Sequence, residues 1–350
     1  VLVSGSEEDI QALGEWPMSD MTLDRVFERL TAAGARAIGL DIYRDMPIPP
    51  GSSELQQTLL GNDRIIVVKK FGSPGVKPPA YMEGSGRVGF TDTVVDADGI
   101  VRRSLLFLDD ESGVSYGLSL RLALLYLADE DIWPQAGEPD PSYIRLGEVT
   151  LPPFQPYDGV SIDGVDAFPV IGLVDLLAGN IADEVFRDRI VIVGISADSV
   201  KDAFFTPIST GLQEHKSVPG AMVHAYLASQ LVRAGMDGEQ ILKTVSERYQ
   251  LSWILLWGLL GSMAGLFVRS FPRLVLLSIS GVAVIAATSW WAFQYGWWFS
   301  LIGAAVSWLL SASLVTAYLS GYERLQRGLL MELFSKHVSS DVADEIWKNR

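Results

Sequence analysis

The chain divides into two parts by the spacing of its apolar residues. Up to Arg248, short apolar runs alternate with polar stretches, and from Tyr249 onward three long apolar runs follow one another closely. A helix needs about 20 apolar residues to cross roughly 30 Å of bilayer hydrocarbon. The runs at 250–268, 274–293 and 297–319 contain no charged residue, so we expect three membrane-spanning helices.

The first part alternates between strand and helix patterns. Continuous apolar runs predict buried strands at 1–3, 37–42, 64–68 and 189–194. Helical spacing or composition predicts helices at 23–30, 52–60, 116–127, 171–177 and 219–231. Thr22 is the expected N-cap of the first helix, and the Asp-Gly step at 98–99 predicts a hairpin. The fold class is therefore α/β: a mainly parallel sheet covered by helices, with a hairpin region, followed by an all-α bundle of three spans.

These patterns set the expected domain organisation. We expect a folded head at 1–236, a juxtamembrane helix at 237–249, the three spans within 250–320, and a linker helix that begins a further domain at 321–350.

Charge is distributed unevenly between the two parts. Residues 1–248 hold 20 Lys and Arg against 37 Asp and Glu, whereas residues 249–350 hold 7 against 5. A strongly acidic head repels phosphates, which argues against nucleic acid as a partner. The chain has no cysteine, so disulfides and thiolate metal sites are excluded.

Basic residues near the spans predict the orientation. The first connection, 269–273, holds two arginines, the second, 294–296, holds none, and three basic residues follow within 321–336. By the positive-inside rule, the C-terminus is cytoplasmic and residues 1–248 are extracytoplasmic in a multi-pass protein of the inner (plasma) membrane. The tryptophans and tyrosine at 290–298 suit the outer interfacial belt.

Small residues in the spans predict close helix packing. Gly261 and Gly265 are four residues apart, and Gly303, Ser307 and Ser311 repeat the same spacing. Such spacing lets helices approach one another. We favour packing over a conduction path, because no ionisable group lies within the spans.

Six segments of the first part occur in an order that is familiar from a known family. They are LGEWP at 13–17, GLDI at 39–42, DADGIVRR at 96–103, IVGISA at 192–197, Asp202 with TP at 206–207, and PGAMVHA at 219–225. Together they resemble the type-2 CHASE domain, an extracytoplasmic sensor domain of bacterial signalling receptors, over about residues 1–235. The resemblance implies three following spans. Met18 and segment 135–169 depart from the family pattern, and no ligand residue carries over.

The segment after the spans resembles a second family. LFSKHVSSDVADEI at 333–346 is similar to the run that leads into class III nucleotidyl cyclase domains. The two resemblances together imply a receptor that senses a stimulus and regulates an adenylate or guanylate cyclase. Magnesium or manganese is expected for that cyclase domain, whose catalytic residues lie beyond this chain. A histidine or Ser/Thr kinase output, or a membrane-anchored envelope enzyme, are the alternatives, and a transporter is the weakest.

An apolar seam in the same segment suggests a second copy as partner. Residues at alternating spacings of three and four form this seam: Leu319, Tyr322, Gln326, Leu329 and Leu333. The pattern is typical of a short dimeric coiled coil, and a plain amphipathic helix is the alternative. We therefore expect a homodimer anchored in the lipid bilayer.

Candidate ligand-binding residues follow the predicted strands. Asp41, Ser196, Asp198 and Asp202 come at or after apolar runs, and in α/β sheets ligands bind beyond the carboxyl ends of strands. The alternative for Asp41 is that it caps a neighbouring helix or loop. Arg102 could bind an anionic ligand or pair with a carboxylate of the head.

Other chemistries find no support in the pattern. Asp96 and Asp98 lack the remaining ligands of a calcium loop, and His224 is more typical of a packed histidine than of a metal ligand. Ser196 lacks the G-x-S-x-G context of a hydrolase nucleophile. We expect no catalytic residue, metal site or cofactor within 1–350.

Overall fold

The computed structural model describes residues 1–110, 113–138, 142–156, 168–207, 217–239, 243–245, 247–268 and 270–335. The chain forms two compact units, Val1–Ile241 and Leu242–Arg350. The first is the predicted α/β head and the second carries the three long helices.

A six-stranded sheet forms the centre of the head. Its strands, in spatial order, are β13 (Val170–Gly172), β1 (Leu2–Gly5), β14 (Ile190–Ile195), β2 (Ala37–Leu40), β3 (Ile65–Lys69) and β4 (Val88–Phe90). Each neighbouring pair runs parallel, which confirms the predicted sheet.

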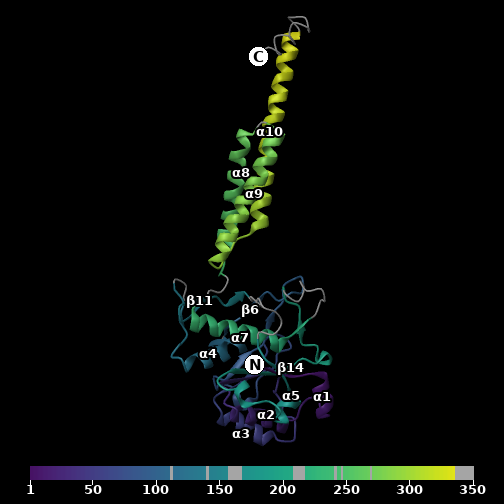
Figure 1. Cartoon of the computed structure of the whole chain (residues 1–350), viewed down its shortest axis with the longest axis vertical. Helices are drawn as coiled ribbons and strands as arrows, with labels where there is room; N and C mark the ends of the chain where they lie inside the picture. The colour runs from purple at the N-terminus through teal and green to yellow at the C-terminus, as the bar shows by residue number, and fades with distance from the viewer. Residues whose placement is uncertain are drawn as a thin grey trace. The chain divides into compact units, whose positions relative to one another are not determined.

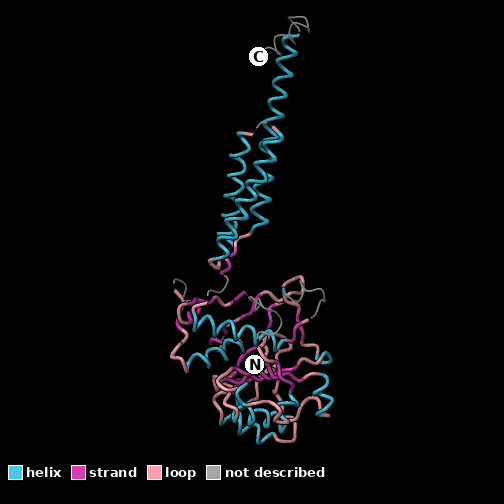
Figure 2. Tube along the Cα trace, in the orientation of Figure 1, coloured by secondary structure: helices cyan, strands magenta, loops and turns pink. Residues whose placement is uncertain are grey.

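Helices cover both faces of this sheet (Figure 1; Figure 2). One face packs against α2 (Asp20–Ala32), α3 (Ser52–Gly61) and α5 (Leu173–Leu177), and α1 (Glu7–Leu13) lies beside α5. The other face packs against α4 (Leu118–Ala128) and α7 (Gly220–Asp237). Successive strand residues serve opposite cores: Val193 belongs to the first and Ile192 to the second, as the period of two requires.

The start of α2 differs from the prediction. Ser19, not Thr22, is the N-cap, and its hydroxyl accepts a hydrogen bond from the Thr22 N–H at 3.3 Å. Thr22 instead lies in the first turn, where its hydroxyl donates to Glu15 at 2.6 Å. Both residues can cap a helix, and both hydroxyls also donate to the Glu15 carboxylate.

The predicted hairpin is present. β5 (Thr93–Val94) and β6 (Arg103–Leu105) pair antiparallel, and Gly99 takes a φ of +82° in the turn between them. β12 (Phe154–Pro156) adds a third strand. The remaining strands of the head form smaller sheets: β7 (Phe107–Asp110) with β8 (Gly113–Tyr116), β9 (Gln135–Ala136) with β10 (Ile144–Leu146) and β11 (Val149–Leu151), and β15 (Ala203–Phe204) with β16 (Val218–Pro219).

The second unit contains three helices long and apolar enough to cross a membrane. They are α8 (Glu247–Phe267), α9 (Phe271–Gln294) and α10 (Leu301–Ser335). Two boundaries differ from the prediction. The third helix begins at Leu301 rather than 297, because β18 (Trp297–Trp298) pairs parallel with β17 (Lys243–Thr244).

The predicted juxtamembrane helix at 237–249 is also interrupted. Gly238, at a φ of +65°, ends α7, and β17 follows before α8 begins at Glu247. A glycine in the left-handed region is a common helix stop. The linker helix predicted from 321 is the continuation of α10 as far as Ser335, and the rest of that segment lies outside the described residues.

Glycines set the packing of α8 on α10. A Cβ built on Gly258 would lie 2.6 Å from Ser307 Oγ, and one on Gly261 would lie 2.4 Å from Ser311 Oγ. On Gly265 it would meet the Ala312 carbonyl oxygen at 2.8 Å. These contacts confirm the predicted role of the small residues in helix packing.

Candidate functional site

Polar side chains gather at the carboxyl ends of the central strands of the head. Asp41 directly follows β2, and its N–H donates to the Val193 carbonyl of β14 at 2.8 Å. A Cβ on the adjacent Gly194 would lie 3.6 Å from the Asp41 Cβ. Asp41 therefore lies over the boundary between β2 and β14, where a ligand of an α/β sheet can bind.

Asp202 approaches the same place from another segment. Its main-chain carbonyl accepts the Gly220 N–H at 3.0 Å, and its Oδ2 would lie 2.5 Å from a Cβ on Gly220. This carboxylate thus borders the first turn of α7, where the helix dipole favours negative charge.

Burial raises the pKa values of both carboxyl groups, and the charge of Asp41 adds to the rise at Asp202. Asp41 Oδ2 is shielded from solvent and has no hydrogen-bond partner among the described residues. Burial raises the pKa of Asp41 to about 7. Burial and the charge of Asp41 raise the pKa of Asp202, and His224 and Lys70 oppose that rise. Two neighbouring carboxylates in such a place resist losing both protons.

His224 lies on α7 beside these acids and is held by Ser119 of α4. The Ser119 hydroxyl donates to the His224 carbonyl at 3.0 Å and lies 3.1 Å from Nδ1. Because that hydroxyl proton is already used, Nδ1 must carry a proton and Nε2 is the unprotonated nitrogen. Burial lowers the pKa of His224 to about 4, and the charge of Asp202 opposes the shift.

Tyr43 and Thr91 extend the site. The two hydroxyls lie 2.8 Å apart. Burial and the charges of Asp41, Asp202 and Asp92 raise the pKa of Tyr43. We call the set of Asp41, Tyr43, Asp202 and His224 the polar crevice.

The structure places the other predicted site residues, Arg102, Ser196 and Asp198, on other segments of the head. Arg102 pairs with Asp96 at 2.9 Å and with Asp98 at 2.6 Å, so its charge is satisfied within the hairpin. Ser196 follows β14, where its N–H donates to the Gly5 carbonyl at 3.0 Å. Asp198 begins a short 3-10 helix, Asp198–Val200, and is exposed.

Sequence reasoning missed Tyr43, Thr91 and Ser119. Thr91 follows β4, a strand of only three residues, so the pattern gave no reason to place it beside Asp41. His224 was expected to be packed or hydrogen-bonded, and its bond to Ser119 agrees with that expectation. The heptapeptide at 219–225 could have pointed to His224, because it spans the start of α7 and His224 lies one turn into that helix.

The chemistry available to the polar crevice is limited. Within the described ranges no three His, Cys, Asp or Glu side chains are grouped closely enough to hold a metal ion. The Asp41 carboxyl group can take up a proton near neutral pH, and the two carboxylates can accept a cationic group.

Fold and sequence together define the class of protein: a parallel α/β head joined along the chain to three helices able to cross a membrane. Residues 1–263 match the family model of the CHASE2 domain, and the chain belongs to that family. It therefore has the architecture of a transmembrane sensor. No curated protein and no solved structure matches the chain.

Proposed function

We propose that the chain is the sensory and membrane part of a receptor whose CHASE2 head faces the extracytoplasmic side and regulates a cytoplasmic output. The observation that carries this proposal is the continuity of α10, which runs without a break from the third span to Ser335. At 1.5 Å per residue, such a helix extends well past roughly 30 Å of hydrocarbon. It offers a rigid connection between the membrane and the following segment.

The output that we propose is a class III adenylate or guanylate cyclase that uses magnesium or manganese. The resemblance of residues 333–346 to the run before such domains supports it. The test is cyclic nucleotide formation from ATP and GTP by membranes that carry the full-length gene product. Phosphotransfer to a histidine or to Ser/Thr, without cyclic nucleotide, would replace this output with a kinase.

Cysteine labelling tests the orientation, because the chain has no cysteine of its own. Single cysteines at Ser85 and Gln294 are expected to react with a membrane-impermeant maleimide added outside intact cells. Cysteines at Ser270 and Leu329 are expected to react only after permeabilisation, since the connections alternate sides. Reaction of Ser85 and Leu329 from the same side would contradict the receptor proposal.

We also propose that two copies pair through α10. Tyr322 and Leu329 of the predicted seam are 51% and 54% exposed, which leaves them available to a second copy past the span. Oxidation of the Leu329→Cys variant is expected to link two chains covalently. A matched cysteine at Gln294, in the short connection before α10, serves as the control.

Within the head, we propose that the polar crevice responds to protons or to a cationic ligand. The raised pKa values of Asp41 and Asp202 support this role. Ser196 and Asp198, which follow the neighbouring strand, are proposed as its outer edge. Arg102 is assigned to the hairpin because of its two carboxylate partners.

A further inference from the structure

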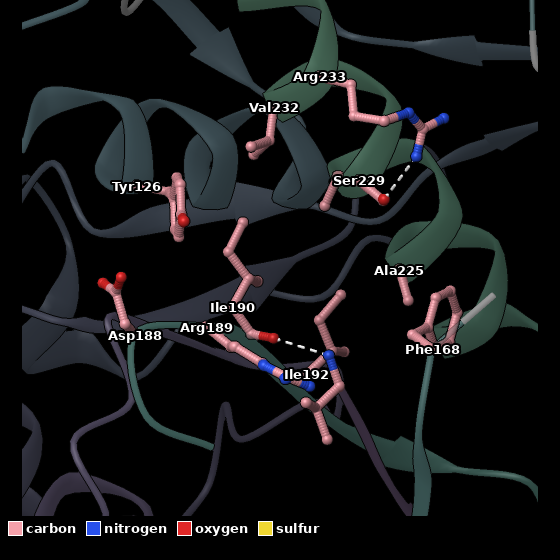
Figure 3. Close-up of a pocket in the computed structure, with 12 residues that line it drawn as sticks. Tyr126, Phe168, Asp188, Arg189, Ile190, Ile192, Ala225, Ser229, Val232 and Arg233 are labelled. Atoms are coloured by element: carbon pink, nitrogen blue, oxygen red, sulfur yellow. Dashed lines mark hydrogen bonds between the residues drawn. The ribbon is translucent and has the colours of Figure 1, made fainter. Parts of the chain in front are cut away.

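A separate cavity lies beneath α7, at the end of the sheet where β14 begins. It encloses about 210 Å³ between the sheet, α4 and α7 (Figure 3). Most of its lining is apolar and is contributed by Tyr126, Phe168, Ile190, Ile192, Ala225 and Val232. The small side chains of Ala225, Ala228 and Ser229 leave this space open, since larger residues there would fill it.

Among the charged side chains around the cavity, one positive charge has no ion-pair partner in the described part of the chain. Asp188 pairs with Arg36 at 3.1 Å, and Arg233 pairs with Glu239 at 2.6 Å. Arg189 lines the cavity from the sheet side, is exposed, and has no ion pair within the part of the chain that the structure describes (Figure 3).

Two hydrogen bonds engage other polar groups of the cavity. Arg233 also donates to Ser229 Oγ at 2.8 Å (Figure 3). The Val1 nitrogen donates to the Ile190 carbonyl at 2.9 Å. Arg189 is therefore a charged side chain that is available to a ligand.

We propose that this cavity binds a small organic carboxylate with a compact apolar body, with the carboxylate at Arg189 and the body against Ile190, Ile192 and Phe168. A guanidinium recognises a carboxylate through two parallel hydrogen bonds. A dry cavity of about 150 Å³ is enough to hold benzene, so the space fits a single ring or a branched chain of similar size.

The position of the cavity links the ligand to signalling, a step that rests on the proposed receptor function. Five of its lining residues lie on one face of α7: Ala225, Ala228, Ser229, Val232 and Arg233. After α7 ends at Asp237, the chain reaches α8 within a short connection. A ligand that fills the cavity fixes the position of α7 on the sheet. It changes the balance between two conformations of the receptor only if it binds one of them more tightly than the other.

The test is calorimetric titration of the whole chain in nanodiscs with benzoate and with benzamide, its uncharged counterpart. Benzoate is expected to bind saturably, and benzamide at least about 10-fold more weakly, because the amide cannot form the charged pair. Arg189→Gln is expected to weaken benzoate by a similar factor. Arg187→Gln, which removes a nearby exposed arginine that does not line the cavity, is the matched control.

Filling the cavity gives an independent test. Ala228→Leu places a larger side chain in the space and is expected to abolish benzoate binding while Arg189 remains. If this variant does not fold, Ser229→Leu addresses the same space from the partly exposed side of α7. Equal binding of benzoate by the native chain, Arg189→Gln and a folded filled variant would overturn the proposal, as would the absence of saturable binding by benzoate.

The two proposals fail separately in these experiments. Binding is measured without any output domain. Lack of binding therefore contradicts the proposed carboxylate ligand and does not affect the receptor proposal. Normal binding with no cyclase or kinase activity in the full-length product would overturn the proposed output alone.

Discussion

Replacing Gly194 with alanine is expected to lower the free energy of unfolding of the head by about 3 kcal/mol. A Cβ at this position would lie 2.3 Å from the Ala221 Cβ on the first turn of α7. Real Cβ atoms do not approach so closely, so α7 would have to move away from β14. For a domain of this size the change corresponds to a fall of about 6 to 12 °C in unfolding temperature.

Thermal unfolding of the whole chain in detergent, followed by circular dichroism, measures this effect. Gly61→Ala is the matched control, because nothing lies within 4 Å of a Cβ there and alanine suits a helix. Ala221→Gly in the Gly194→Ala background is expected to recover most of the loss, since it removes the clashing atom. An unchanged unfolding temperature for Gly194→Ala would contradict the described contact between β14 and α7.

Replacing Asp41 with asparagine is expected to change how stability depends on pH. The folded pKa of Asp41, about 7, lies above its ordinary value of 3.8. The folded state therefore holds a proton that the unfolded state releases, and stability falls as pH rises from about 4 to 7, by at most about 1.4 kcal/mol per pH unit. Asparagine removes this loss, because it resembles the protonated acid.

His224 gives the opposite slope over nearly the same range. Its folded pKa is about 4 against an ordinary 6.5, so stability falls as pH drops through that window. The two residues offset each other in the native chain. Asp41→Asn is expected to unmask the loss of stability at acid pH, and His224→Gln the loss toward neutral pH. The double variant is expected to keep only the smaller loss with rising pH that the raised pKa of Asp202 contributes.

Denaturant titrations of the whole chain between pH 4 and 8 measure these slopes. Asp45→Asn, which changes an exposed carboxylate near Asp41, is the control for the loss of a negative charge. Parallel pH profiles for Asp41→Asn and the native chain would show that Asp41 is ionised and solvated in the folded head.

The parts of the molecule that the sequence predicts are those with strong local patterns. The buried strands at 37–42 and 189–194 and the three apolar runs carry their own signal, and the structure places strands and helices there. The polar crevice is only half predictable. Asp41 follows from the rule of strand ends. Asp202 lies beyond the end of β14 at Ile195, and it joins Asp41, as Tyr43, Thr91 and Ser119 do, only through the tertiary fold.

The misplaced boundaries have a common cause. Trp297 and Trp298 continue an apolar run, so local hydropathy assigns them to the third span. The structure instead pairs them with Lys243 and Thr244, a contact between distant segments that local hydropathy does not encode. Likewise the cavity under α7 arises from the mismatch of two packed surfaces, and no local pattern marks it.

The pairing of β17 with β18 has a mechanical consequence. It joins the residues that precede α8 to those that precede α10 by backbone pairing. The glycines of α8 also pack closely against α10. A displacement of Lys243 is therefore expected to reach α10 through the paired strands, without passing through α9. We therefore expect α8 and α10 to move together. The second helix, α9, contacts α10 at Gly281, against which the Trp308 ring lies.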